Sequence, residues 1–114
     1  MESIVTEQEK EILIITAEEC GEVIQAVTKI LRFGKESKVA AAYTNMHRLE
    51  EEIGDLYCMI GLLIERGLVS EEAVYKASTN KYDRLKNYSN IFDVCDQGLT
   101  NEDYEMIYGW GGQG

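Results

Sequence analysis

Two pairs of acidic residues form the most informative pattern in this sequence. Glu19 and Glu22 make one pair, Glu52 and Asp55 make the other, and the members of each pair are three residues apart. Side chains at this spacing project from adjacent turns on one side of a helix. We therefore expect two helices that can bring four carboxylates together.

Both acidic pairs lie in segments where apolar residues recur at intervals of three and four. The first stripe consists of Ile12, Ile15, Glu19, Glu22, Ala26 and Ile30, and the second of Leu49, Ile53, Leu56, Ile60 and Leu63. Such a stripe is normally the buried face of an amphipathic helix. The first pair is thus predicted to face inward. Glu52 lies on the flank of the second stripe, and Asp55 lies one turn further on.

Carboxylates gathered on an inward face need a counter-charge, because burial and mutual repulsion both disfavour their ionised form. The sequence places few cations on the same stripes, so a bound cation is the expected partner. Oxygen donors without His or Cys suit Mg²⁺, with Mn²⁺ as the substitute. The alternative is that the acids lie on a solvated face. Two acidic pairs on two helices favour the metal site.

Other kinds of site fit this sequence poorly. A di-iron carboxylate centre needs Glu-x-x-His on two helices, and His47 is the only histidine. The sequence contains no P-loop, EF-hand, nucleophile elbow or dinucleotide-binding fingerprint. Divalent-metal phosphoryl chemistry remains, in which the ion binds phosphate oxygens and lowers the pKa of a bound water.

Capping residues and glycine stops delimit the helices that carry these acids. The predicted helices run from a capping box at Thr6 and Glu9 to Phe33, from Thr44 or Asn45 to about Arg66, and from Ser70 to about Tyr88. Residues 34–43 are predicted to be a connection with some helix late in it. A short fourth helix is predicted between Thr100 and Tyr108.

The predicted fold class is all-α, a helical bundle of three main helices plus a short C-terminal helix. The absence of proline agrees with long helices. Oligomerisation is expected to complete the bundle, because 114 residues bury a modest core and Met59 to Ile64 is strongly apolar. We divide the chain into a helical domain, 1–88, and an acidic extension, 89–114, with a flexible end.

Composition excludes several classes of partner. With 21 acids against 11 bases and a net charge of −10, the chain has no broad surface for a nucleic-acid backbone. No apolar run is long enough to cross a membrane, and no signal peptide is evident. Three cysteines in no metal-ligand spacing argue against disulfides and zinc. We expect Cys20 and Cys58 to be small core residues in a reducing cytoplasm.

The acidic motifs also carry a family resemblance. Glu18-Glu19-x-x-Glu22 followed by Glu52-x-x-Asp55 resembles the signature of the all-α nucleoside triphosphate pyrophosphohydrolases, the MazG-like family. The surrounding words AEECGEVIQAVTKILRFG, LEEEIGDLYCMIGLLIERG and NKYDRLKNY resemble short phage-type members. The similarity covers roughly residues 8–88. The gap between the two motifs is long for the family, and the 34–43 connection accounts for it.

The resemblance implies an activity and a set of site residues. Glu19, Glu22, Glu52 and Asp55 would be the Mg²⁺ ligands and catalytic residues. Water would attack the α-phosphorus of a (deoxy)nucleoside triphosphate and release monophosphate and pyrophosphate. The substrate-binding residues would be Asn80, Lys81 and Arg84, together with Lys29 and Arg32, although the last two also suit a helix C-terminus. Family members assemble as homodimers or homotetramers.

Three functional hypotheses follow from these observations. The first is a cytoplasmic metal-dependent pyrophosphohydrolase, in the host cytoplasm if the chain is phage-encoded, with a purine nucleotide such as dGTP as substrate. The second keeps the fold and site but hydrolyses another phosphoanhydride, such as a nucleoside diphosphate. The third is a helical interaction or regulatory module without catalysis. Stabilisation by Mg²⁺ would separate the first two from the third.

Overall fold

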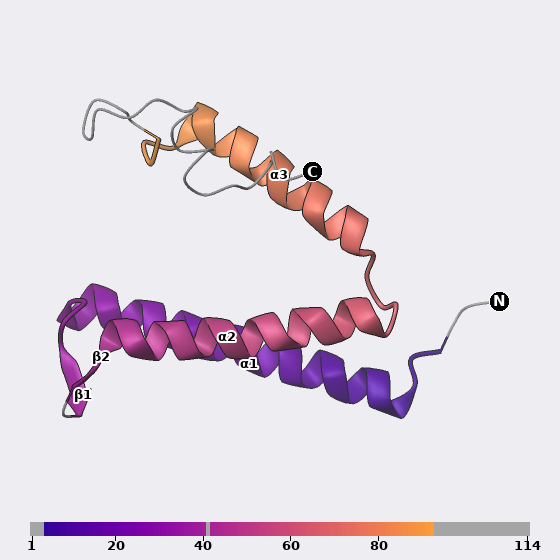
Figure 1. The fold of residues 1–114 in the computed structure, drawn as a ribbon, viewed down its shortest axis with the longest axis horizontal. Coiled ribbons are helices and arrows are strands. Elements are labelled where there is room, and N and C mark those ends of the chain that lie inside the picture. Colours follow the sequence, from indigo (N-terminus) through magenta and orange to yellow (C-terminus); the bar gives the residue numbers. More distant parts are fainter. Residues whose placement is uncertain (1–3, 41, 93–114) are drawn as a thin grey trace. The chain divides into compact units, whose positions relative to one another are not determined.

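The computed structural model describes residues 4–40 and 42–92 and confirms the all-α fold class (Figure 1). Three helices carry the described chain: α1 (Glu7–Phe33), α2 (Asn45–Glu65) and α3 (Glu71–Tyr88). The chain divides into two compact units, residues 1–69 and 70–114. The predicted helix between Thr100 and Tyr108 lies outside the described residues.

Helix α1 begins and ends where its capping residues require. The hydroxyl of Thr6 accepts a hydrogen bond from the Glu9 N–H, and the Glu9 carboxylate accepts one from the Thr6 N–H, each at 3.0 Å. This capping box satisfies two amides that lack partners within the helix. Gly34 ends the helix at φ 94°, a conformation that favours glycine. The predicted bounds of α1 are confirmed.

Helix α2 starts with a similar reciprocal cap. The His47 N–H donates to the Thr44 hydroxyl at 3.2 Å, and the Thr44 N–H donates to the imidazole Nδ1 at 3.0 Å. The single histidine therefore has a structural role at this helix start. Arg66 and Gly67 follow the last turn, with Gly67 at φ 74°. The predicted start at Thr44 or Asn45 and the end near Arg66 are confirmed.

The connection between α1 and α2 differs from the prediction. It contains an antiparallel ribbon of two short strands, β1 (Lys38–Ala40) and β2 (Tyr43–Thr44), and no late helix in its described residues. The buried Asn45 holds this reversal by donating its side-chain amide to the Gly34 carbonyl at 3.0 Å. A short alanine segment gains too few helical hydrogen bonds to nucleate a turn, so strand pairing prevails.

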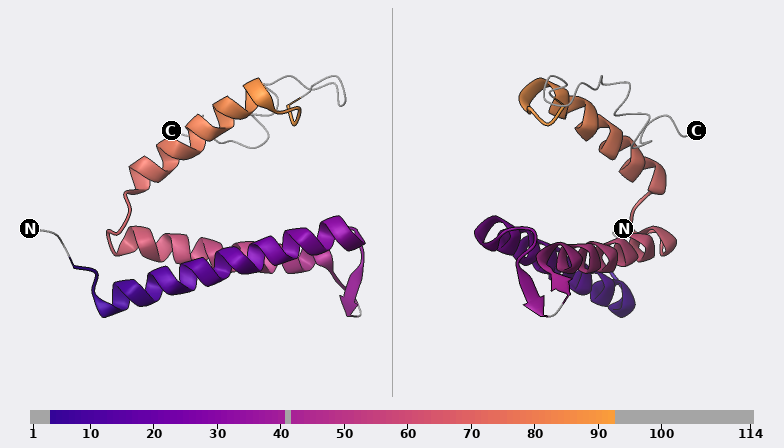
Figure 2. Two further views of the ribbon diagram at one scale, coloured as in Figure 1. Left: turned by 180° about the vertical axis from the view of Figure 1, so that it is seen from behind. Right: turned by 60° about the vertical axis from the view of Figure 1, so that its left-hand side comes forward.

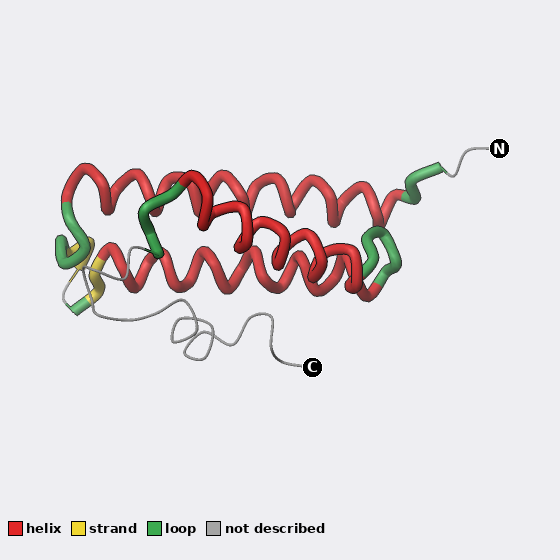
Figure 3. The backbone as a smooth tube through the Cα atoms, turned by 90° about the horizontal axis from the view of Figure 1, so that it is seen from above, coloured by secondary structure: helices red, strands yellow, loops and turns green. Residues whose placement is uncertain are grey.

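Helices α1 and α2 form an antiparallel hairpin and lie side by side along their lengths (Figures 1 and 3). The buried apolar residues are Ile12 and Ala26 on α1 and Met59 on α2, with Ala26 only 1 % exposed. The other members of the predicted α1 stripe are half-buried. The inward face predicted for α1 is confirmed, including the position of its two acids.

The inward face of α2 is turned relative to the prediction. Ile53, placed on the predicted stripe, is 47 % exposed, whereas Met59 is buried. The face that meets α1 runs through Glu52, Leu56, Met59 and Leu63, which are buried or half-buried. Glu52 therefore lies on the packed face, rather than on its flank, and its side chain is only 14 % exposed.

The cysteine prediction was wrong for this chain. Cys20 and Cys58 are both exposed. Each is adjacent in sequence to an inward residue, Glu19 or Met59, and neighbouring helical positions point about 100° apart. A small apolar side chain inside a helical run does not by itself identify the buried face.

The second unit begins with α3. The Ser70 hydroxyl accepts a hydrogen bond from the Ala73 N–H at 3.2 Å, which confirms Ser70 as the predicted cap. The ring of Tyr82 on α3 and the ring of Phe92, which follows the helix, have centroids 4.8 Å apart. Two further views show the same elements (Figure 2). Within the described part of the chain, no helix is long and apolar enough to cross a membrane.

Candidate metal centre

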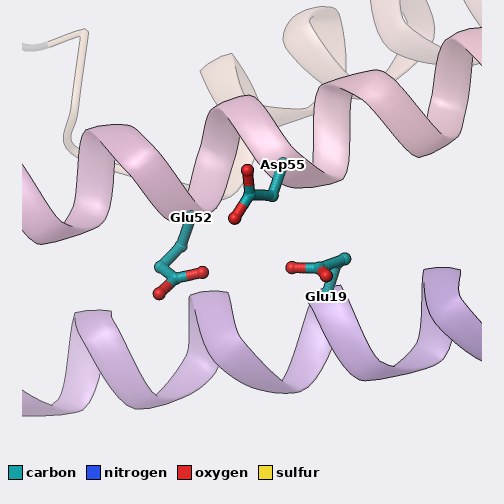
Figure 4. Close-up of side chains that lie close together, drawn as sticks. All are labelled: Glu19, Glu52 and Asp55. Carbon is teal, nitrogen blue, oxygen red and sulfur yellow. The ribbon is translucent and has the colours of Figure 1, made fainter.

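Three of the four predicted carboxylate ligands meet between α1 and α2. Glu19 extends from α1, and Glu52 and Asp55 extend from α2 toward it (Figure 4). Each offers one carboxylate oxygen, and the three oxygens lie within 4.8 Å of one another. Antiparallel packing opposes the middle of α1 to the first half of α2. The i,i+3 spacing then places Glu52 and Asp55 on adjacent turns beside Glu19.

The fourth predicted ligand, Glu22, has a different neighbour. Its Oε1 lies 3.5 Å from Nη2 of Arg48, while Nε of the same arginine donates to Oε2 of Glu52 at 3.2 Å. Arg48 is on α2, one turn before Glu52, and its side chain is 26 % exposed. One guanidinium group thus joins acids from both helices.

Sequence reasoning missed Arg48. The predicted α2 stripe passed through Leu49 and Ile53, which placed the arginine off the inward face. Its i,i+4 spacing to Glu52 was the available signal, because oppositely charged residues at that spacing are neighbours on a helix. The expectation that few cations share the acids' faces therefore needs this correction.

The raised pKa of Glu19 agrees with the close approach of the other acids. The pKa of the Glu19 carboxyl is raised above its ordinary value, first by partial desolvation and then by the negative charges of Asp55, Glu52, Glu22 and Glu18, in that order. Both causes disfavour the ionised form, and a cation among the oxygens would favour it. Three convergent carboxylates without nitrogen or sulfur donors are a donor set suited to a hard divalent cation.

The ribbon contacts α2 beside this cluster. The Tyr43 hydroxyl donates to Oε1 of Glu51 at 2.6 Å, and that hydrogen bond is the main reason why the Tyr43 pKa is raised. Glu51 is thereby engaged with the ribbon, while the next residue, Glu52, points toward α1. The ribbon is thus tied to the turn of α2 that carries the cluster.

The predicted phosphate-binding residues lie in two places. Lys29 and Arg32 are exposed near the C-terminal end of α1, and Lys29 is two turns beyond Glu22. The Arg32 guanidinium stacks 4.8 Å from the ring centroid of Phe33. These positions agree with either role that the sequence suggested, a helix-end cation or a phosphate contact.

The other three predicted phosphate-binding residues belong to the second unit. Nζ of Lys81 donates to the Tyr88 hydroxyl at 3.0 Å, and this hydrogen bond is the main cause of a lowered Tyr88 pKa. Nε of Arg84 donates to the Asn80 carbonyl at 3.4 Å. Lys81 and Arg84 thus stand on the basic C-terminal half of α3, each with a contact on its own element.

Fold and site together define an all-α protein whose helical hairpin carries a carboxylate cluster suited to a divalent cation. The model of the family described as MazG nucleotide pyrophosphohydrolase domain matches residues 7–89 of this chain. The match covers most of the chain, so the chain belongs to the MazG family. It is a nucleotide pyrophosphohydrolase, a hydrolase that acts on phosphoanhydride bonds. No curated protein and no solved structure gives a significant match.

Proposed function

We propose that Glu19, Glu52 and Asp55, joined by Glu22, hold Mg²⁺ at the site where a nucleoside triphosphate is hydrolysed. The observation that carries this proposal is the approach of three carboxylate oxygens from two helices to within 4.8 Å of one another. The raised pKa of Glu19 supports it, because the cluster lacks enough positive charge of its own. Mn²⁺ has similar ligand preferences and is the proposed substitute.

The proposed reaction is a hydrolysis at the α-phosphorus. Water forms a bond to that phosphorus, the bond from the α-phosphorus to the bridging oxygen breaks, and pyrophosphate leaves with that oxygen. The products are nucleoside monophosphate and pyrophosphate, with a proton released to solvent. A bound divalent cation would supply charge neutralisation at the phosphate oxygens and a lowered pKa for a water molecule. The carboxylates fix where both effects act.

The basic residues are proposed to bind the phosphate chain. Lys81 and Arg84, with Asn80 beside them, present two cations on one part of α3. Their contacts with Tyr88 and the Asn80 carbonyl leave further N–H donors, because an ammonium has three and a guanidinium five. Lys29 and Arg32 offer a second pair on α1. Positive charge at both places would offset the acidic surface that a polyphosphate must approach.

We further propose that the working form is a homodimer or homotetramer. The hairpin leaves large apolar side chains exposed on both of its helices, including Leu31 at 80 % on α1 and Tyr57 at 73 % on α2. Exposed apolar area of this kind on two helices is typical of an interaction surface. Light scattering coupled to size exclusion tests this proposal, and a monomer at micromolar concentration would refute it.

The decisive experiment measures pyrophosphate release by the wild type and by Glu19→Gln and Asp55→Asn. Outer-shell partners of metal ligands are worth about 10–100-fold, so loss of a direct ligand should reduce turnover by more than about 100-fold. Glu11→Gln, which neutralises an exposed acid on α1 outside the cluster, is the matched control. Wild-type turnover in either cluster variant would refute the site assignment.

The substrate is proposed to be a purine deoxynucleoside triphosphate, with dGTP as the single choice. A panel of deoxynucleoside triphosphates and diphosphates, scored for monophosphate and for pyrophosphate or phosphate, tests both the base and the leaving group. Pyrophosphate from triphosphates supports the assigned bond cleavage. Orthophosphate from diphosphates with inert triphosphates would instead show the diphosphate reaction.

A further inference from the structure

Arg48 has no part in the reaction described so far, yet it contacts two of the four proposed ligands. Its Nη2 faces Oε1 of Glu22 across the helix interface at 3.5 Å, and its Nε donates to Oε2 of Glu52 at 3.2 Å. The Glu52 side chain is the least exposed of the three. A guanidinium group is always charged and presents its donors in a rigid fork. Arg48 is therefore a permanent cation fixed at the edge of the cluster.

A divalent cation and Arg48 compete for the same two carboxylate groups, those of Glu22 and Glu52. A Mg²⁺ ligand oxygen lies about 2.1 Å from the ion, and an oxygen at that distance has less electron density to offer a guanidinium. The positive charge of Arg48 also repels the incoming ion. Glu22, which faces the arginine and stands apart from the three-oxygen cluster, must leave or share that contact before it can coordinate the ion.

We propose that Arg48 is a built-in competitor of the divalent cation. Without the ion, its charge offsets the repulsion between Glu22 and Glu52 and stabilises the hairpin. When the ion arrives, the same charge opposes binding, so Arg48 sets the concentration at which the site loads. This inference rests on the proposed metal site and assigns to Arg48 a regulatory role.

The size of the effect follows from Coulomb's law. A unit charge roughly 6 Å from a divalent cation, at an effective dielectric constant of about 40–60, between bulk water and a protein surface, changes ion affinity by about 20- to 100-fold. Salt at physiological strength reduces the interaction over this distance by about half in energy. We therefore expect Arg48→Gln to bind Mg²⁺ about five- to tenfold more tightly than the wild type.

The opposite role would give the opposite result. If Arg48 mainly holds Glu22 and Glu52 in a geometry ready for the ion, its loss would loosen both ligands and weaken Mg²⁺ binding. General damage to the hairpin would also weaken binding, and it would lower thermal stability as well. Tighter ion binding together with lower stability of the ion-free protein is a combination that neither of these explanations predicts.

The test uses the full chain, freed of metal with EDTA and then dialysed. Mg²⁺ alone is titrated calorimetrically into the wild type, Arg48→Gln and Arg48→Lys, and thermal unfolding is followed without the ion. Arg66→Gln is the matched control, because Arg66 directly follows the same helix but donates to Gln8, away from the acids. It removes the same charge from the chain and leaves the cluster intact.

We expect tighter Mg²⁺ binding and a lower midpoint for Arg48→Gln, while Arg48→Lys and Arg66→Gln stay within about twofold of wild-type affinity. Weaker binding by Arg48→Gln, or equal tightening by Arg66→Gln, would overturn the proposal. So would tightening in Arg48→Lys, since that variant keeps the charge. A wild type that binds no Mg²⁺ would overturn the proposed metal site as well, and this distinguishes the two failures.

Discussion

Neutralising one cluster acid should stabilise the ion-free protein while it removes activity. In Asp55→Asn the side chain keeps its shape and loses its charge. If Asp55 shares a site with Glu19 and Glu52, the change relieves repulsion with both. A solvated acid on an outer face would have no such neighbours, and its amide variant would leave stability almost unchanged. The sign of the stability change therefore tests the geometry directly.

The cluster distance sets the magnitude. At 4.8 Å, the upper bound on the separation of the carboxylate oxygens, two unit charges in bulk water repel enough to change an equilibrium constant by about fourfold. Asp55 has two such neighbours, and salt screening halves their energies. The net effect is about fourfold in the folding equilibrium, which corresponds to a rise of roughly 3–7 °C in Tm for a domain of this size.

Circular dichroism at the helical minimum, recorded on heating in EDTA and again in Mg²⁺, measures the unfolding midpoint of the ion-free protein and the rise in that midpoint when the ion is added. The wild type should gain stability in Mg²⁺, since a ligand that binds only the folded state raises its midpoint. Asp55→Asn should start higher in EDTA and gain little from the ion. Glu11→Gln should behave as the wild type does. A midpoint for Asp55→Asn at or below the wild-type value in EDTA would refute the shared site.

Three further predictions concern packing, the chain reversal and pH. Ala26→Leu overfills the tightest point of the hairpin and should cost about 1–3 kcal/mol in denaturant unfolding; unchanged stability would contradict the packing. Asn45→Ala leaves the Gly34 carbonyl without its donor and should cost about 1–3 kcal/mol, measured in the same way. Because the pKa of Glu19 is raised in the fold, the ion-free folded state binds more protons than the unfolded state at pH values between 4.5 and the raised pKa. The contribution of Glu19 to the free energy of unfolding therefore falls as the pH rises through this range. The wild-type minus Glu19→Gln difference in unfolding free energy should show that slope, and a flat difference would contradict it.

Helix bounds and the inward face of α1 could be predicted because local chemistry determines them. A capping box, a serine cap and a glycine stop satisfy or end the backbone hydrogen bonds of adjacent residues, so a short stretch of sequence contains the needed information. The inward face of α1 could be predicted because the stripe through Ile12 and Ala26 recurs at intervals of three and four, although Ile14 and Ile24 lie exposed on other sides of the helix. The local signals of Thr6, Ser70 and Gly34 agreed with the structure.

The face of α2 could not be chosen in the same way. From Leu56 to Ile64 apolar residues point in several directions, so periodicity permits more than one inward stripe. Contact with α1 selects the stripe that contains Met59 and leaves Ile53 exposed. The same rotation brings Arg48 and Glu52 inward. Because the predicted inward face of α2 was rotated by a fraction of a turn, Arg48 was not predicted to lie beside the acids that it contacts.

The ribbon explains why acid spacing alone could not define the site. Spacing within each pair fixes the direction of two side chains on one helix, but their approach to the other helix depends on the register between helices. Here the register between α1 and α2 follows from the connection between them, where the Asn45 side chain donates a hydrogen bond to the Gly34 carbonyl and the Tyr43 hydroxyl donates one to the Glu51 carboxylate. These contacts are side chain to backbone or strand to helix, and they leave no periodic trace in the sequence.

The hairpin buries few apolar side chains, so its gathered acids need compensating positive charge. Few apolar side chains are buried between α1 and α2 in the described chain, so packing alone leaves a small margin against the repulsion of like charges gathered at Glu19. Arg48 offsets part of that repulsion through Glu22 and Glu52, and a divalent cation would offset the rest. Apolar surface left on the outer faces offers a further gain on self-association. A bound divalent cation and a second copy of the chain would thus each add stability to a hairpin that gathers these acids.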